Sequence, residues 1–177
     1  KKEALAQLDI DIILLKYAQE FCRPTENRSY QDEIDFLVTY EKRNKFIANL
    51  AVNQDGNTLV LFNLVDRHGK GLRDLIESRL KYGQRLFFVS CETKTTDREQ
   101  IQNIVDTQKN SIILASLGTF STGINIKNLH NVIFASPSKS QIRVLQSIGR
   151  GLRLSDDGSV TKLYDIADDL HWKSKKN

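Results

Sequence analysis

The feature that most constrains the fold is the regular alternation of short apolar runs with longer amphipathic stretches. Runs such as 57–62, 85–90 and 111–116 carry almost no charge, which is typical of strands buried on both faces of a parallel sheet. The stretches between them place apolar residues at helical spacing. Repeated strand–helix units of this length predict an α/β protein with an open, doubly wound, mainly parallel sheet and helices on both faces.

The expected elements follow one another along the chain. Strands are expected at 10–17, 57–62, 85–90, 111–116, 131–136 and 160–167. Helices are expected at 30–52 (one or two), 66–81, 95–108 (opening with a threonine cap) and 138–153, with loops at 23–29 and 117–129. Ligands of such sheets bind beyond the carboxyl ends of the strands, so the loops after 111–116 and 131–136 are the first places to look for a site.

Charge is distributed unevenly over the 177 residues, a length that suits one full domain. The net charge is +4, but no Asp or Glu occurs from Thr107 to Ser155, so that stretch holds +6 and the remainder −2. Its cations are Lys109, Lys127, Lys139, Arg143, Arg150 and Arg153. Such a focused positive field suits a polyphosphate. Chance combined with a solvated face is the alternative.

Composition excludes several classes of protein. No apolar run approaches the length needed to span a membrane, so no membrane partner is expected. Cys22 and Cys91 form neither a disulfide framework nor a metal-binding spacing, which indicates free thiols in a reducing compartment such as the cytoplasm. The chain has no methionine, even at position 1, so we expect a piece of a longer protein.

The expected helix 138–153 gathers basic residues on one side. At 100° per residue Arg150 and Arg153 share a face with Arg143 and Gln146, and Gly149 leaves room for a close approach. Guanidinium groups bind phosphate oxygens in pairs, and two of them can neutralise the charge of a transferring phosphoryl group. An amphipathic helix with ordinary surface arginines is the alternative.

The loop after 111–116 combines glycines with small hydroxyl side chains. It contains Ser116, Thr119, Gly123 and, just beyond, Asn125. Hydroxyls and free backbone N–H groups can cradle a sugar-phosphate chain. A loop that merely turns the chain is the alternative.

Together these segments resemble the superfamily-two helicases. "SLGTFSTGINI" is similar to motif V of that family, and "QSIGRGLR" to its motif VI, Q-x-x-G-R-x-x-R. "NTLVLFN" falls where motif IV belongs, and "VSCETKTTDRE" falls where the family has a second nucleic-acid-contacting loop. The resemblance begins at about Tyr30, so 1–30 is expected to be a strand and linker from a preceding domain, and 31–177 a second RecA-like domain. It is strongest to phage helicases that remodel branched DNA.

The resemblance implies a role for each matching residue. Arg153 would be the arginine finger reaching the γ-phosphate of ATP. Arg150 would assist at the phosphates or in coupling the domains, and Gln146 would contact the nucleotide or the surroundings of the attacking water. The residues implied to line the nucleotide side are Gly123, Asn125 and Gly149. Those implied to touch the nucleic acid are Ser90, Arg98, Ser116 and Thr119, with Phe120 as the candidate for stacking on a base.

Two ATPase motifs are missing. No G-x-x-x-x-G-K-[ST] occurs, because "RHGKGLR" has the wrong spacing, and no D-E-x-[DH] follows a strand. This chain alone should therefore be inactive, with ATP and Mg²⁺ held mainly by the first RecA-like domain of the same full-length protein. The implied substrate is DNA, branched or at duplex–single-strand junctions, with an RNA–DNA hybrid as a further candidate. The implied location is the host cytoplasm if a phage encodes the protein.

Two other functions remain open at this point. The chain could be a non-catalytic nucleic-acid-binding module, or a doubly wound small-molecule enzyme with Cys91 as its nucleophile. Asp168 and Asp169 could be paired acids for acid–base catalysis, although a helix cap or a salt-bridged loop is favoured. The three histidines, His68, His130 and His171, are interpreted as structural, and Phe62 as a core residue.

Overall fold

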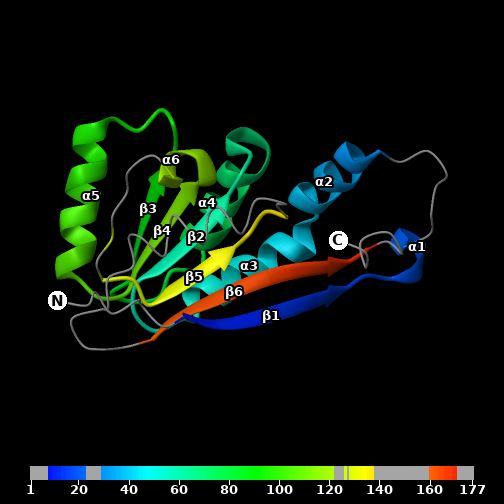
Figure 1. Ribbon diagram of the computed structural model, residues 1–177, viewed down its shortest axis with the longest axis horizontal. Coiled ribbons are helices and arrows are strands. Elements are labelled where there is room, and N and C mark those ends of the chain that lie inside the picture. The colour runs from blue at the N-terminus through cyan, green and yellow to red at the C-terminus, as the bar shows by residue number, and fades with distance from the viewer. Residues whose placement is uncertain (1–7, 23–28, 122–125, 127, 138–159, 171–177) are drawn as a thin grey trace, which may run out of the picture.

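The computed structural model describes residues 8–22, 29–121, 126, 128–137 and 160–170. Within these ranges six strands form one sheet in the order β1-β6-β5-β2-β4-β3, and every described pairing is parallel (Figure 1). The strands are β1 Leu8–Lys16, β2 Thr58–Phe62, β3 Arg85–Val89, β4 Ser111–Ser116, β5 Asn131–Phe134 and β6 Thr161–Asp169. The predicted α/β fold with a parallel, doubly wound sheet is confirmed.

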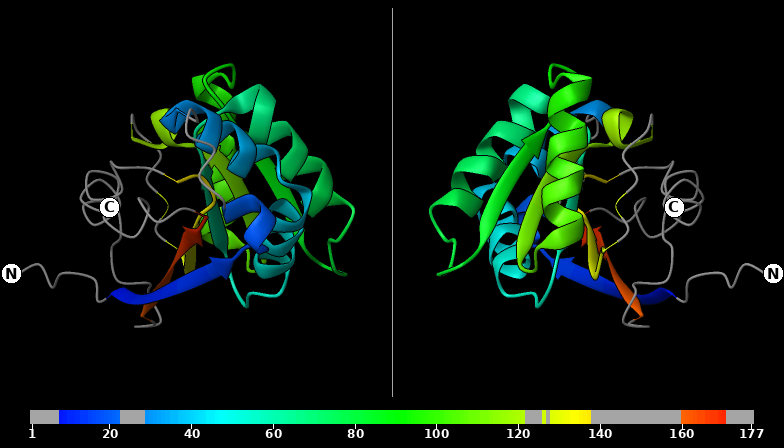
Figure 2. Two further views of the ribbon diagram at one scale, coloured as in Figure 1. Left: turned by 90° about the vertical axis from the view of Figure 1, so that its right-hand side faces the viewer. Right: turned by 90° about the vertical axis from the view of Figure 1, so that its left-hand side faces the viewer.

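Helices cover both faces of this sheet (Figure 2). They are α1 Gln19–Cys22, α2 Tyr30–Thr39, α3 Glu41–Val52, α4 Lys70–Glu77, α5 Thr95–Thr107 and α6 Leu117–Ser121, and a π-helical turn, η1, spans Val65–Gly69. Two apolar clusters result. Ile47 of α3 and Ile76 of α4 belong to one, and Val105 of α5 and Phe120 of α6 belong to the other.

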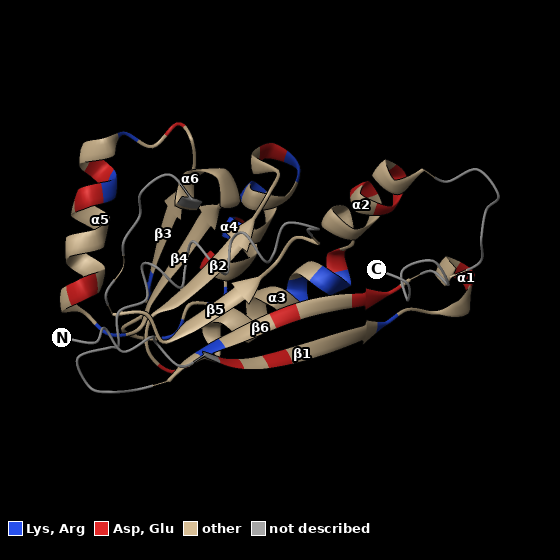
Figure 3. Ribbon diagram, viewed as in Figure 1, with Lys and Arg blue, Asp and Glu red and all other residues tan. Residues whose placement is uncertain are grey.

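The three central strands explain the uncharged runs of the sequence. Every residue of β2, β4 and β5 is buried, and these strands carry no charged side chain (Figure 3). Because helices cover both faces, neither face of these strands can carry a charge without burying it. Strand β1 at the sheet edge differs, since Ile12 is 70% exposed and its neighbours Asp9 and Asp11 are exposed as well.

Some local expectations are wrong. The 95–108 helix has no threonine cap, because its N-cap is Lys94, which makes no side-chain capping bond. The expected loop 117–129 begins with the short helix α6, and the expected helix 66–81 begins as a π-helical turn and ends at Glu77. The 30–52 segment, expected to form one or two helices, forms two, because Tyr40 between them is extended, with φ −70° and ψ 110°. The loop expected at 23–29 and the helix expected at 138–153 lie almost entirely outside the described residues.

A buried amide holds the amino edge of the sheet together. Asn57 is fully buried just before β2, and its Nδ2 donates to the carbonyls of Val105 and Gln108 at 2.9 Å each and of Asn128 at 2.8 Å. Its Oδ1 accepts from the backbone N–H of Ser111 at 2.9 Å. One side chain thus joins the end of α5, the start of β4 and the approach to β5.

We expect Asn57→Ala to lower the free energy of unfolding of the 177-residue chain by about 3 kcal/mol, because it leaves several buried backbone groups without partners. Urea unfolding measures this loss. The matched control is Asn103→Ala on the exposed side of α5, which should change stability by less than about 0.5 kcal/mol. A loss at Asn57 as small as that of the control would contradict the role of this amide.

Candidate functional site

The carboxyl edge of the sheet brings together loops from distant parts of the sequence. Because the strands are parallel, their carboxyl ends meet at one edge, where ligands of such sheets bind. Ser90 follows β3 and Ser116 ends β4, and these two strands are neighbours. Asn63 follows β2 and Ser136 lies just beyond β5, and these strands are also neighbours. The structure therefore places at one edge the starts of the two loops, after 111–116 and after 131–136, in which the sequence analysis expects a site.

The hydroxyls at the end of β4 bond to each other. Ser116 Oγ donates to Thr119 Oγ1 at 2.7 Å, and the backbone N–H of Thr119 approaches Ser116 Oγ at 3.4 Å. The two residues are 6% and 5% exposed. In this conformation both hydroxyls shape the turn into α6, whereas Gly118 between them is exposed.

The loop after β3 is organised by Arg98. Its Nε donates to the carbonyl of Thr93 at 2.9 Å and its Nη2 to that of Ser90 at 3.3 Å. Ser90 is 3% exposed; its backbone N–H donates to Thr93 Oγ1 and its Oγ accepts from the N–H of Glu92. A guanidinium from α5 thus fixes a short turn whose exposed residues include Cys91.

Phe120, the stacking candidate, lies in the core. It is 7% exposed and belongs to the apolar cluster that contains Leu117, Ile126 and Leu129. The ring therefore presents almost none of its surface to a base in this conformation. Phe62, interpreted as a core residue, is fully buried and stacks on Phe88 with ring centroids 5.6 Å apart.

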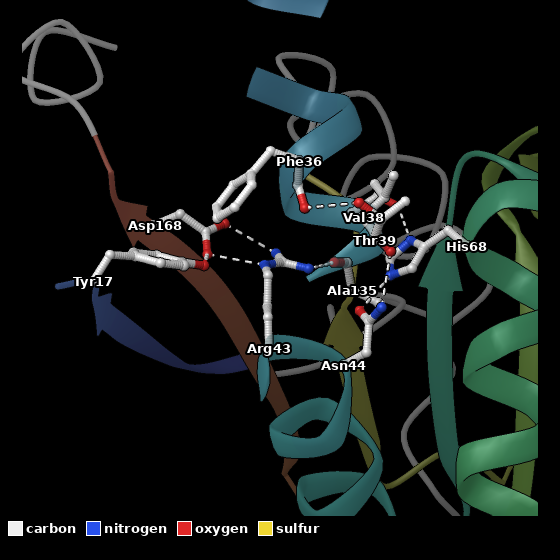
Figure 4. Close-up of polar contacts among 10 residues, drawn as sticks. Tyr17, Phe36, Val38, Thr39, Arg43, Asn44, His68, Ala135 and Asp168 are labelled. Carbon is white, nitrogen blue, oxygen red and sulfur yellow. Dashed lines mark hydrogen bonds and ion pairs between the residues drawn. The ribbon is translucent and has the colours of Figure 1, made fainter. Parts of the chain in front are cut away.

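A chain of buried hydrogen bonds crosses the carboxyl edge through His68 (Figure 4). Asn44 Nδ2 donates to the carbonyl of Val38 at 2.8 Å, which directs Asn44 Oδ1 toward His68 Nε2 at 3.1 Å. His68 Nε2 must then carry the hydrogen, so Nδ1 accepts from Ser136 Oγ at 2.9 Å. Ser136 Oγ in turn accepts from the N–H of Asn63 at 3.0 Å. Only the ring tautomer of His68 with its hydrogen on Nε2 satisfies all of these hydrogen bonds.

The π-helical turn places His68 in this position. The N–H of Gly69 donates to the carbonyl of Leu64 at 2.9 Å, a span of five residues. A Cβ at Gly69 would lie 2.4 Å from Cε2 of Phe62, so only glycine allows the turn to pack this closely. Burial, together with the nearby charge of Arg43, lowers the pKa of His68 to about 3. The ring is therefore neutral, as the hydrogen-bond pattern requires.

Arg43 forms the second buried polar cluster at this edge (Figure 4). Its Nε and Nη2 donate to the two carboxylate oxygens of Asp168 at 2.9 and 3.0 Å, and its Nη1 donates to the carbonyl of Ala135 at 2.6 Å. Tyr17 Oη donates to Asp168 Oδ1 at 2.5 Å. Burial and the carboxylate of Asp168 raise the pKa of the Tyr17 phenol far above its ordinary value.

These contacts correct the interpretation of Asp168 and identify a residue that the sequence analysis missed. Asp168 is ion-paired, but it lies within strand β6 and not in a loop or at a helix cap. Arg43 is 2% exposed and shares the inward phase of α3 with Ile47 and Ala51. A charged residue at a core-facing helical position was the available signal.

Several predicted site residues lie outside the described residues. They are Gly123, Asn125, Gln146, Gly149, Arg150 and Arg153. Of the six cations of the acid-free stretch, only Lys109 is described. Within the described ranges, no three His, Cys, Asp or Glu side chains are grouped to hold a metal ion. None of the helices described there has the length and apolarity needed to cross a membrane.

The sheet order and the carboxyl-edge loops define a RecA-like domain of the kind found at the carboxyl end of helicases. Residues 41–155 match the family described as helicase conserved C-terminal domain, and the chain belongs to this family. This stretch includes both the 116–126 and the 146–153 motifs.

The relatives agree with this assignment. The chain is 38% identical over 174 residues, 97% of its length, to the ATP-dependent DNA helicase UvsW of Enterobacteria phage T4. The crystal structure of T4 UvsW superposes with a TM-score of 0.78 over 94% of this chain. A putative ATP-dependent helicase of Saccharomyces cerevisiae, IRC3, is 31% identical over 60% of the chain. The E. coli DEAD-box protein SrmB, 13% identical with a TM-score of 0.58, shares the fold.

The chain spans about a third of the phage relative, 34% of its length, and 15% of the yeast relative. The similarity therefore concerns one domain of longer proteins.

We expect His68 to make stability depend on pH. The unfolded chain binds the imidazole proton near pH 6.5, whereas the folded chain binds it only near pH 3. The contribution of neutral His68 is therefore complete above pH 6.5 and is lost as the pH falls toward 3. Between pH 7.5 and 5 the wild-type chain should lose about 2 kcal/mol more than His68→Gln. Urea unfolding at a series of pH values tests this, and parallel curves for both proteins would contradict it.

Proposed function

We propose that this chain is the second motor domain of an ATP-dependent helicase that unwinds or branch-migrates DNA, as in recombination, fork or R-loop remodelling. The observation that carries the proposal is the 38% identity to a phage DNA helicase over nearly the whole chain. The family match extends through residue 155, so it includes the Q-x-x-G-R-x-x-R pattern at 146–153.

In this proposal the chain supplies charge to a nucleotide bound mainly by the preceding domain. Arg153 acts as the arginine finger at the γ-phosphate, Arg150 assists at the phosphates, and Gln146 contacts the nucleotide. Gly123, Asn125 and Gly149 line the same cleft. ATP bound with Mg²⁺ supplies the phosphoryl group that water attacks, and the arginines stabilise the charge that develops on it.

We assign Mg²⁺ to the preceding domain, because this sequence lacks the phosphate-binding loop that would hold the metal together with ATP. The chain has no G-x-x-x-x-G-K-[ST] loop, and its described residues group no carboxylates suited to a metal ion. Asp168, whose side chain is 5% exposed, already has both carboxylate oxygens bound by Arg43. This chain alone should therefore not hydrolyse ATP.

The DNA contacts are assigned to the loops after β3 and β4. Arg98, Ser90, Ser116 and Thr119 hold these loops in shape through the bonds described above, and the strand would pass across the exposed parts of the same loops. Contacts of this kind are made to the phosphate backbone and carry little sequence preference. Closure of the two domains around ATP would then move the bound strand.

We expect Arg153→Ala in the full-length protein to lower kcat for ATP hydrolysis by about a thousandfold, because arginine fingers contribute effects of this size. DNA binding measured by fluorescence anisotropy should remain within about twofold, since Arg153 is assigned to the nucleotide and not to the strand. Arg67→Ala is the matched control, because its guanidinium lies on the surface and pairs with Asp35. Turnover close to wild type in Arg153→Ala would rule out the finger role.

We also expect DNA affinity to fall steeply with salt and to vary little with sequence. Neutralising phosphates releases counterions, so a protein that makes about six phosphate contacts should bind about a thousandfold more weakly in 200 mM than in 50 mM salt. Anisotropy titrations with two unrelated DNA sequences measure both effects. An affinity that is independent of salt would contradict a backbone-dominated interface.

A further inference from the structure

Two buried side chains hold the point where the chain leaves β5. The ladder between β5 and its neighbours ends at Phe134, which pairs with Leu61 and Asp165. Beyond it, the N–H of Ala135 still reaches the carbonyl of Leu61, at 2.9 Å. Two polar groups that follow are bound by side chains. The carbonyl of Ala135 accepts from Arg43, and the hydroxyl of Ser136 bonds to His68.

Arg43 and His68 are each fixed by further buried hydrogen bonds. Asp168 binds Arg43 through both carboxylate oxygens, and Tyr17 donates to the same carboxylate. Asn44, the neighbour of Arg43 on α3, orients His68 through its amide. Two neighbouring residues of α3 therefore hold the β5 exit. Arg43 binds Ala135 directly, and Asn44 holds Ser136 through the imidazole of His68.

Burial shows that this arrangement is specified in detail. Arg43, Ser136 and His68 are 2%, 2% and 0% exposed, and the Asp168 side chain is 5% exposed. A buried ion pair often adds little stability compared with apolar packing, and in some proteins such a pair serves to fix one conformation. Here the conformation that is fixed is that of Ala135 and Ser136, where the chain leaves the sheet.

We propose that Arg43 and His68 are positioning residues that fix the β5 exit at Ala135 and Ser136, from which the sequence runs on to the proposed nucleotide residues Gln146, Arg150 and Arg153. This inference rests on the proposed function of those residues. Arg43 and His68 are 2% and 0% exposed, so they present almost no surface to a nucleotide or to DNA. They act on the chain at Ala135 and Ser136, and a displaced exit is expected to lower turnover without weakening the binding of nucleotide or DNA.

The test uses the full-length protein with two variants that disturb the exit from different sides. Arg43→Lys keeps the positive charge beside Asp168 but lacks the planar fork that reaches Asp168 and Ala135 together. Ser136→Ala removes the hydroxyl that links Asn63 to His68. Arg67→Lys is the matched control, because it makes the same exchange at a guanidinium whose side chain is 55% exposed.

We expect Arg43→Lys and Ser136→Ala each to lower kcat for ATP hydrolysis about tenfold at saturating DNA, because misplacement by about 1 Å has effects of this order. The KM for ATP and the Kd for DNA should stay within about twofold of the control. A merely structural role would instead lower the thermal unfolding midpoint and leave kcat at 25 °C unchanged, and that result would overturn the proposal. If Arg43→Lys fails to fold, Ser136→Ala decides in the same way.

Arg153→Ala, measured alongside, separates this inference from the proposed function. If Arg153→Ala retains wild-type turnover, the finger role assigned under the proposed function fails. If Arg153→Ala loses turnover while the two exit variants keep the kcat of the control, only the positioning inference fails.

Discussion

Burial of the central strands on both faces is the constraint on which the rest of this structure depends. Strands β2, β4 and β5 lie between two helical layers, so they carry no charged side chains, and the backbone groups at their ends need partners within the protein. At the amino edge Asn57 satisfies this need with a single amide. At the carboxyl edge the need is met by Arg43, His68 and the residues behind them.

The two edges differ in what their polar groups do. The amide of Asn57 at the amino edge joins the end of α5, the start of β4 and the chain before β5. The groups at the carboxyl edge hold chain that is leaving the sheet, toward the side where ligands of such folds bind. Buried polar groups need hydrogen-bond partners at both edges. At the amino edge these bonds join elements of the core, and at the carboxyl edge they hold the chain next to the expected binding region.

Much of the fold could be predicted from the sequence because the signal was local. The apolar run 111–116 is the strand β4 without any change of bounds, and the other strands differ by a few residues. Local chemistry was misleading at Thr95, where a threonine suggested a cap that the backbone places at Lys94. It was silent about α6 and about the π-helical turn, whose shape depends on the packing of Gly69 against Phe62.

The site was less predictable because its contacts join residues far apart in the sequence. Asp168 was recognised as a carboxylate of interest, but its partner Arg43 lies on α3 and nothing near either residue points to the other. Ser90, Ser116 and Arg98 were found by resemblance to known motifs, whereas the inward direction of their bonds needed coordinates. The roles of Arg150 and Arg153 still rest on that resemblance.

Strand β1 has a consequence for how the domain is made. It pairs residue for residue with β6, from Leu8 opposite Thr161 to Lys16 opposite Asp169, although these strands lie at opposite ends of the described chain. During synthesis β1 leaves the ribosome well before β6, its only described neighbour, so its backbone N–H and C=O groups have no strand partner until β6 is made. Closing so long a loop is entropically costly, so this pairing should form late and open early. Until β6 has been made, the unpaired β1 can therefore pair with a wrong strand.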